Sequence, residues 1–328
     1  MSRLLGPALG LLVLVTAPLW IGNAYYVNVA SQILIYAVFA LGLNVLVGYA
    51  GLVSLGHAGL FGVACYATAW LVAAGWGHLP AALGAILLLL LTSAVFAVLS
   101  LRTSGIGFLM ITLALGQILW GLAYRWIDLT GGDNGINLAS RPAPLGLSLA
   151  FATPFYYFTL VVFLIAVASM AVFIASPFGV SLKGTRDQPR RMTALGYNVW
   201  LIRFLAFLFS GFWSGIAGLL FCYYNQFVSP NVLALGSSAE VLLMVISGGS
   251  GTLMGPIAGA ALVVVMKNVA SAYIERWNFV LGAIFVLIVV FMPDGLVPGL
   301  ARLARRATAG SRPQSAVVVT APREGTGR

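Results

Sequence analysis

Long apolar runs separated by short polar connectors occupy most of the chain. An α-helix rises 1.5 Å per residue, so about 20 apolar residues cross the hydrocarbon core of a bilayer. The pattern predicts ten helices, over Pro7–Ile21, Val27–Val47, Leu52–Ala74, Ala81–Leu101, Gly107–Trp126, Pro154–Ala175, Leu201–Tyr223, Ser238–Ser247, Gly255–Tyr273 and Phe279–Met292. The eighth run has about half the required length, so it must be buried against protein or a cavity. The predicted fold class is therefore an all-α integral membrane protein with about ten transmembrane helices, one of them short or broken.

Composition supports this class. Hydrophobic residues make up 61% of the chain and charged residues 7%, whereas soluble domains carry about a quarter charged residues. A chain so poor in charge has no polar shell for its core, so its solvent is lipid. We expect residues 1–300 to form one transmembrane domain. Residues 301–328, rich in Arg, Pro, Ser, Thr, Ala and Gly, are predicted to be a disordered basic tail.

The 17 basic and 7 acidic residues give a net charge of +10, and the basic residues gather in a few loops. The positive-inside rule explains this better than nucleic-acid binding, because Lys and Arg stay on the cytoplasmic side of a membrane. The most basic internal loop, Lys183–Arg203, is therefore placed in the cytoplasm, and the near-neutral loop Arg125–Thr153 outside. Counting crossings puts both termini in the cytoplasm if Ser238–Ser247 crosses. The N-terminal apolar run has no clear cleavage site, so we expect a retained helix rather than a signal peptide.

Motifs for catalysis or cofactors are not found. The two cysteines, Cys65 and Cys222, lie in apolar segments, and the two histidines are far apart, so neither a disulfide framework nor a metal site is predicted. The chain has no GxxxxGK[ST] phosphate loop, no HExxH and no GxSxG. We therefore expect no cofactor, no metal and no enzymatic activity.

Several polar residues interrupt the apolar runs, and in hydrocarbon such groups must face partners or water. They either line a solute path or bond neighbouring helices, and they are Asn44, Ser54, His57, Thr112 and Gln117. Two charged residues also fall in apolar segments. Glu240, near the start of the short helix, is interpreted mainly as a carboxylate that complements the helix dipole. Lys267 is interpreted as a side chain that extends toward an interface.

Glycines are spaced closely in two segments, residues 48–62 and 248–259. Glycine at four-residue spacing lets membrane helices approach closely, and glycine also permits a helix to break beside a cavity. The pattern alone leaves both interpretations open.

The cytoplasmic segment Gly184–Gly196 reads GTRDQPRRMTALG. A helix of about two turns is predicted here, with Thr185 or Asp187 as the N-cap, Pro189 in the first turn and Gly196 at the C-terminus. Two turns are not stable alone in water, so the helix needs a docking surface. The alternative from the residues is an ordinary basic loop.

Several ordered blocks are similar to one family of membrane proteins. Residues 43–58 read LNVLVGYAGLVSLGHA and resemble the opening signature of the branched-chain amino acid ABC permeases. Residues 110–117 (MITLALGQ) and 130–136 (TGGDNGI) resemble its middle signature. Further blocks follow in the expected order, SPFG at 176–179, ALGYNV at 194–199, FVSP at 227–230 and GGSGTLMGP at 248–256.

The resemblance implies a subunit of an importer in the bacterial inner membrane. Such a permease pairs with a second, similar permease and with two cytoplasmic ATPase subunits, and a periplasmic binding protein delivers the solute. ATP is hydrolysed in the partner. The segment Gly184–Gly196 then becomes the coupling helix that docks on an ATPase, with the contact residues Thr185, Arg186, Asp187, Gln188, Pro189, Arg190, Arg191, Met192, Ala194, Leu195 and Gly196.

The sequence departs from the family in this segment, because family members often carry acidic residues and alanines where this chain has QPRRMT. The basic stretch predicts an acidic groove on the partner ATPase. It also leaves the solute open between a branched-chain amino acid and the urea, short amides or aromatic acids that relatives of the family carry. A standalone secondary carrier or channel is the alternative. A membrane-embedded enzyme is disfavoured, because no nucleophile–base pair is evident.

Overall fold

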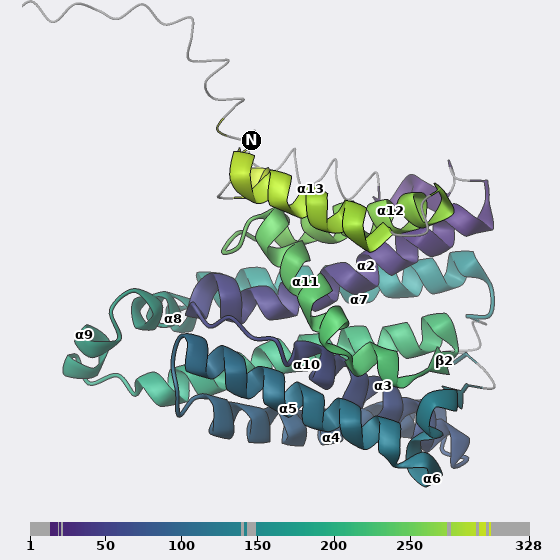
Figure 1. Cartoon of the computed structure of the whole chain (residues 1–328), viewed down its shortest axis with the longest axis horizontal. Helices are drawn as coiled ribbons and strands as arrows, with labels where there is room; N and C mark the ends of the chain where they lie inside the picture. The colour runs from purple at the N-terminus through teal and green to yellow at the C-terminus, as the bar shows by residue number, and fades with distance from the viewer. Residues whose placement is uncertain are drawn as a thin grey trace, which may run out of the picture.

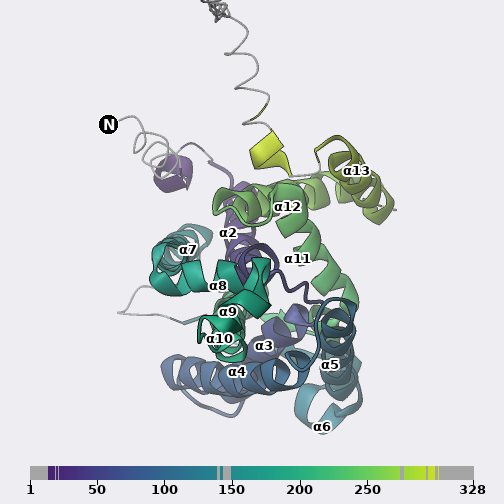
Figure 2. The ribbon, with the colours of Figure 1, turned by 90° about the vertical axis from the view of Figure 1, so that its left-hand side faces the viewer.

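The computed structural model describes residues 14–18, 20, 22–138, 141–142, 149–273, 277–292, 295–299 and 302. Its helices lie side by side with their axes roughly along one direction (Figure 1), and Figure 2 shows the same bundle end-on. Most of the predicted helix Pro7–Ile21, and the predicted tail at 301–328 except for residue 302, lie outside the described residues.

The elements in residues 24–175 are mostly long helices, with a π-helix and a short strand between them. They are α2 (Ala24–Asn44), the π-helix η1 (Val45–Ala50), α3 (His57–Ala73), α4 (His78–Ser100), α5 (Ile106–Arg125), the one-turn α6 (Ile127–Thr130), the 3-10 turn η2 (Gly132–Asn134), β1 (Ile136–Asn137) and α7 (Ala152–Ala175).

The second half contains the predicted cytoplasmic segment and the last apolar helices. Its elements are α8 (Pro177–Asp187), α9 (Pro189–Ala194), α10 (Val199–Asn225), β2 (Phe227–Val228), the 3-10 turn η4 (Pro230–Leu233), α11 (Leu235–Gly248), α12 (Met254–Tyr273) and α13 (Trp277–Phe291). The predicted short segment Ser238–Ser247 is part of α11, whose 14 residues give about 21 Å.

The arrangement of buried and exposed residues is that of a membrane protein. In the most apolar 18-residue stretch of α2 with η1, 83% of the residues are buried. In the corresponding stretches of α4, α5 and α7 the buried share is 28%, 22% and 28%. The central α2 contacts α7, α10, α11 and α12. On α4 the exposed side chains include Leu79, Leu83, Leu87 and Leu91, which share one face of the helix. Such a face is stable against lipid but not against water, and five described helices are long and apolar enough to cross a bilayer.

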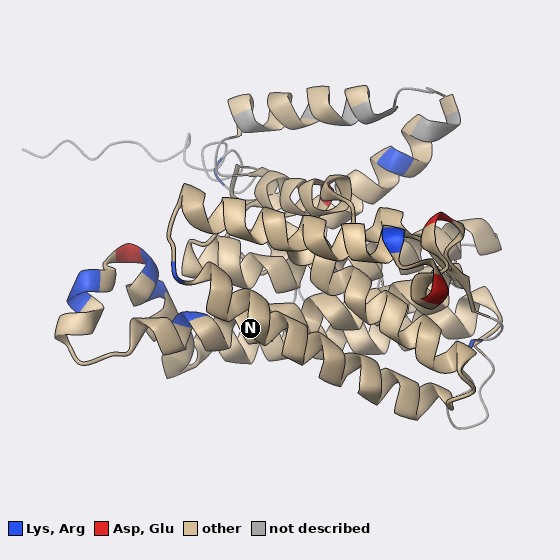
Figure 3. Cartoon of the chain, turned by 60° about the horizontal axis from the view of Figure 1, so that its bottom comes forward, with Lys and Arg blue, Asp and Glu red and all other residues tan. Residues whose placement is uncertain are grey.

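Charged residues gather at the two ends of the bundle. Figure 3 shows long uncharged stretches of helix between a basic group at α8 and α9 and a mixed group at the opposite end. The basic end contains Lys183, Arg186, Arg190, Arg191 and Arg203. This separation is the one that the loop charges predicted.

The helix at the centre of the bundle ends in an irregular stretch that is longer than the predicted gap between Val47 and Leu52. After α2 the chain widens into the π-helix η1 and then turns at Gly51, whose φ of 69° is left-handed. Residues 51–56 are not helical, and α3 starts at His57. The predicted start at Leu52 was therefore wrong, because residues 52–55 are apolar enough to look like a helix but follow a left-handed glycine.

The two glycine-rich segments meet at this break. A Cβ atom built on Gly48 would lie 2.3 Å from the backbone nitrogen of Gly251 and 2.4 Å from the amide oxygen of Asn44. No side chain fits at such distances, so Gly48 is needed for a close approach of two backbones. Close packing and an interrupted helix thus occur together here.

The opposite end of the bundle is closed by a small sheet and an arginine. Strands β1 and β2 pair antiparallel, with Ile136 opposite Val228. The Arg141 guanidinium donates hydrogen bonds to the carbonyl oxygens of Tyr223, at 3.0 Å, and Tyr224, at 2.9 Å. Burial lowers the pKa of Arg141 from its usual value. These contacts fix the end of α10 and the strand β2 that follows it.

The contact at Gly48 can be tested by adding one methyl group. We expect Gly48→Ala to destabilise the chain by about 1–3 kcal/mol, since overpacking forces the break and residue 251 apart. The matched control is Gly121→Ala in α5, where a Cβ would meet no atom within 4 Å. That control should stay within about 1 kcal/mol of the native chain. The measurement is the midpoint of heat-induced loss of monodisperse protein in detergent, and equal midpoints for the two variants would contradict the contact.

Candidate functional site

His57 joins three segments of the core through its two ring nitrogens. Its Nδ1 lies 2.9 Å from the Ser54 hydroxyl, and its Nε2 lies 2.9 Å from the Ser210 hydroxyl of α10. Ser210 donates its own proton to the carbonyl oxygen of Gly42 at 2.6 Å, so it accepts from Nε2. A neutral ring then accepts at Nδ1 from Ser54. The network holds the start of α3, the middle of α10 and the end of α2 in one position.

The side-chain amide of Asn44 bonds to backbone groups of a second non-helical segment. Its side-chain nitrogen donates to the carbonyl oxygen of Thr252 at 2.9 Å, and its side-chain oxygen accepts from the backbone nitrogen of Gly251 at 2.9 Å. Both partners lie in the connection between α11 and α12. One side-chain amide therefore satisfies two backbone groups of a non-helical connection that is more than 200 residues away in the sequence.

Thr112 and Gln117, on α5, differ in their surroundings. The Thr112 hydroxyl accepts from the backbone nitrogen of Leu55 at 3.2 Å and donates to the carbonyl oxygen of Leu109 at 3.0 Å. Gln117 is half-buried. Asn44, Ser54, His57 and Thr112 are buried and bonded to protein atoms in this conformation. Their assignment to a solute path, with that of Gln117, stays a prediction.

The predicted cytoplasmic helix is divided into two helices that project beyond the end of the bundle (Figure 1). In α9, Pro189 occupies the first turn as predicted, and Gly196 follows the C-terminus with a left-handed φ of 87°. The predicted caps are wrong: Gln188 precedes α9, whereas Thr185 is buried in α8 and donates to the carbonyl oxygen of Leu182. The reason is that Pro177 already starts a helix, which runs through residues 185–187.

The surface of α9 and its flanks is open. No residue of α9 is buried, Arg190, Arg191 and Ala194 are exposed, and Met192 is partly covered, packing on Gly184. Leu195 is 66% exposed and adjoins the left-handed Gly196. The segment therefore presents two arginines and an apolar leucine at an open surface.

The first of these two helices is fixed to the interrupted helix in the core. Arg186 of α8 donates through Nη1 to the carbonyl oxygen of Gly48 in η1. The Lys183 ammonium lies 5.2 Å from the centre of the Tyr49 ring. Arg203 of α10 donates to the carbonyl oxygen of Thr185 at 2.9 Å. These contacts join α8 directly to the break after α2 and to α10.

Glu240 and Lys267 form a partly buried ion pair, which neither of the two separate interpretations of these residues included. The Lys267 ammonium is 3.1 Å and 3.2 Å from the two carboxylate oxygens of Glu240. Glu240 thus pairs with a cation on α12 rather than only complementing the dipole of α11, and Lys267 turns toward protein. The pair borders a cavity of about 240 Å³ that Asn225, Asn231 and several aromatic rings also line.

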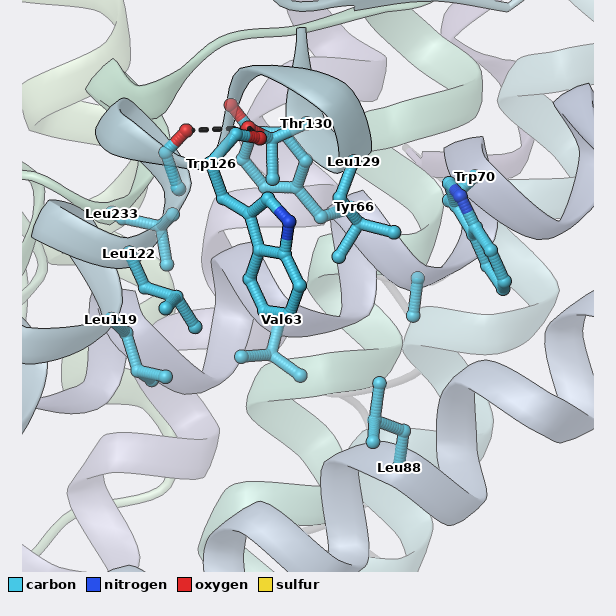
Figure 4. Close-up of a pocket in the computed structure, with 12 residues that line it drawn as sticks. Val63, Tyr66, Trp70, Leu88, Leu119, Leu122, Trp126, Leu129, Thr130 and Leu233 are labelled. Atoms are coloured by element: carbon cyan, nitrogen blue, oxygen red, sulfur yellow. Dashed lines mark hydrogen bonds between the residues drawn. The ribbon is translucent and has the colours of Figure 1, made fainter. Parts of the chain in front are cut away.

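A second cavity, of about 280 Å³, lies between α3, α4 and α5 (Figure 4). Its lining is apolar and aromatic, with the indoles of Trp70 and Trp126 and several leucines, and no charged residue is among the described residues that form it. The Thr130 hydroxyl in its wall donates to the carbonyl oxygen of Ala123 at 2.6 Å. This cavity suits hydrocarbon rather than a polar solute.

Within the described part of the chain, no three His, Cys, Asp or Glu side chains are grouped so that they could hold a metal ion. Cys65 and Cys222 are both buried free thiols.

Comparison with known proteins relates this chain to one family of transport permeases. The family described as "Branched-chain amino acid transport system / permease component" matches residues 25–289. The high-affinity branched-chain amino acid transport system permease protein LivM of Escherichia coli (strain K12) is 32% identical over 321 residues, which cover 88% of this chain and 73% of LivM.

More distant relatives belong to similar systems. The permease protein LivH of the same kind of system in Salmonella typhimurium (strain LT2) is 22% identical over 80% of this chain and 91% of its own length. The autoinducer 2 import system permease protein LsrC of Salmonella paratyphi B is 28% identical over 53% of this chain and 50% of its own. No solved structure matches the chain.

The His57 network makes a prediction about stability. Replacing His57 by Leu keeps much of the volume but leaves the hydroxyls of Ser54 and Ser210 without their ring partner, at an expected cost of about 2–4 kcal/mol. The control Gln117→Leu, at a half-buried position of α5, should change stability by about 0.5 kcal/mol or less. Thermal unfolding of both variants in the same detergent is the measurement. A His57→Leu variant as stable as the control would show that the network does not hold the core.

Proposed function

Because this chain belongs to the family of branched-chain amino acid transport system permease components, we propose that it is the membrane subunit of an ATP-binding-cassette importer. In this proposal it forms the path for a branched-chain amino acid or a related small polar solute that a periplasmic binding protein delivers. The observation that carries the proposal is the exposed helix α9, which α8 connects to the interrupted core helix.

The exposed helix would act as the coupling helix. Its six residues cannot form a stable helix alone, so an ATPase groove that covers Leu195 and the faces of Arg190 and Arg191 accounts for both its exposure and its charge. An acidic groove fits the two arginines. ATP binding and hydrolysis take place in that partner.

The contacts suggest how a movement of the ATPase reaches the membrane. A displacement of α9 shifts α8, whose Arg186 holds the Gly48 carbonyl in η1. Asn44 at the end of α2 in turn holds the connection between α11 and α12. These segments have discontinuous backbones inside the membrane, and such segments often mark the moving parts and the solute path of transporters.

We propose that the α8–α9 end faces the cytoplasm, since it carries the basic loop, and that β1, β2 and α6 face the periplasm. With the predicted helix Pro7–Ile21 the chain then crosses the inner membrane ten times, and both termini lie in the cytoplasm. One such chain, a second similar permease and two ATPase subunits would complete the importer. The similarity to both LivM and LivH supports a pair of two different permeases.

A standalone secondary carrier is the second candidate, and one observation favours it. The Glu240–Lys267 pair is an intramembrane acid–base pair of the kind that ion-coupled carriers use. Purification of the tagged chain from mild detergent separates the two proposals. Copurification of a P-loop ATPase and a second permease supports the importer, whereas a chain that is recovered alone and moves solute without ATP is a carrier.

Reversing the charge of the coupling helix should uncouple the importer. We expect Arg190→Glu with Arg191→Glu to reduce ATP-driven solute uptake into proteoliposomes by about tenfold or more, because two attractive contacts become repulsive. The chain should still fold and insert, since both side chains are exposed. The control is Arg102→Glu in the exposed turn between α4 and α5, which should leave uptake unchanged. Uptake at the native rate in the double variant would refute the docking assignment.

A further inference from the structure

The lining of the cavity beside Glu240 and Lys267 combines two chemically different groups of side chains. The polar group consists of the ion pair with Asn225, Asn231 and Ser237, and the apolar group consists of aromatic rings that include Phe39 and Phe221. At about 240 Å³ the cavity is smaller than the 300–1,000 Å³ of pockets for drug-sized ligands, so it suits a smaller molecule.

The cavity is open to the end of the bundle opposite α9. Asn225 and Asn231, which line it, are exposed at the C-terminus of α10 and in η4. The side chains of Glu240 and Lys267 are 14% and 32% exposed, so their charged groups are within reach of a molecule in the cavity. An ion pair buried in a membrane protein is costly to desolvate, and an apolar pair would join α11 to α12 equally well.

We propose that this cavity is a binding site for zwitterionic α-amino acids, in which Glu240 receives the ammonium group and Lys267 the carboxylate. A zwitterion inserts into the ion pair without changing the net charge of the site, and each charged group finds an opposite partner. An anion would face Glu240, a cation would face Lys267, and uncharged urea or an amide would have to separate the ion pair without offering a charge to either group. The rings beside Phe39 then cover an apolar side chain.

This inference rests on the proposed function, since it names the solute class of that importer. It selects an amino acid with an apolar side chain over urea, short amides and aromatic acids.

Protection of a single cysteine in the full chain tests the site without the partner subunits. Asn231→Cys places a thiol in the cavity wall, and its reaction with a water-soluble maleimide is followed in native membranes. The native thiols, Cys65 and Cys222, are buried and serve as background. We expect L-leucine to slow the reaction at lower concentration than 3-methylbutylamine, which lacks the carboxylate, or 4-methylpentanoate, which lacks the ammonium. A thiol at the exposed Asp128 of α6, introduced by Asp128→Cys, should not be protected.

Replacing Glu240 or Lys267 by an uncharged residue tests the proposed role of each charge separately. In Asn231→Cys with Lys267→Met, the half-protecting concentration of leucine should rise about tenfold or more, and the amine should then protect as well as leucine. In Asn231→Cys with Glu240→Gln, 4-methylpentanoate should protect the thiol as well as leucine does. The variant with both substitutions leaves no unpaired charge to destabilise the helices, and in it the three probes should protect equally.

The outcomes separate this site from the importer role. Leucine protection that is unchanged in the neutral variants, or missing in the native cavity, overturns the site even when the chain copurifies with an ATPase. The expected pattern in a chain that copurifies with no ATPase supports the site and refutes the importer.

Discussion

Hydrocarbon supplies no hydrogen-bond partner, so a helix that breaks inside a membrane must find partners for its backbone in the protein itself. Side chains supply such partners at the break after α2 and at the connection between α11 and α12, which lies against it. Asn44 bonds both ways to the connection between α11 and α12, and Arg186 reaches the Gly48 carbonyl from outside the bundle. The Thr112 hydroxyl accepts a hydrogen bond from the backbone nitrogen of Leu55 in the non-helical stretch. The position of α3, α5, α8 and α12 around α2 follows from these bonds.

The scarce charged residues have separate tasks in this architecture. At one end they form an exposed basic surface on α8 and α9, where Lys183, Arg190 and Arg191 remain in water. Inside the bundle, Glu240 and Lys267 pair with each other and face a cavity. Between the two lies a continuous route of contacts through α8, η1 and the α11–α12 connection. In the proposed importer this route links the surface where the ATPase docks to the proposed solute site.

Apolar runs predicted nearly every long helix, because a segment that must satisfy its backbone in lipid has few choices besides a helix. The same rule placed the start of α3 too early, at Leu52 rather than His57, because the apolar residues 52–55 resemble the start of a helix. The first turn of α9 was predicted correctly from Pro189, since proline fixes its own backbone angle. The caps were not, because the helix that begins at Pro177 depends on packing against α7 and α10.

Contacts between distant residues could not be predicted from local pattern. Glu240 and Lys267 each have a plausible separate explanation until α11 and α12 are seen to be adjacent. Likewise, the polarity of His57 indicates that it needs partners but does not identify Ser210, which is 153 residues away. Local chemistry therefore gave the candidates, and tertiary packing decided what each of them touches.

The partners of Asn44 have a consequence for how the protein is made. They lie 207 and 208 residues downstream, which a ribosome adds in about 10–40 s at 5–20 residues per second. During that time α2 has entered the bilayer, while the side-chain amide of Asn44 still lacks its hydrogen-bond partners at residues 251 and 252. The newly inserted amino-terminal half must therefore be sheltered from lipid, by the insertion machinery or by water, until the last helices arrive.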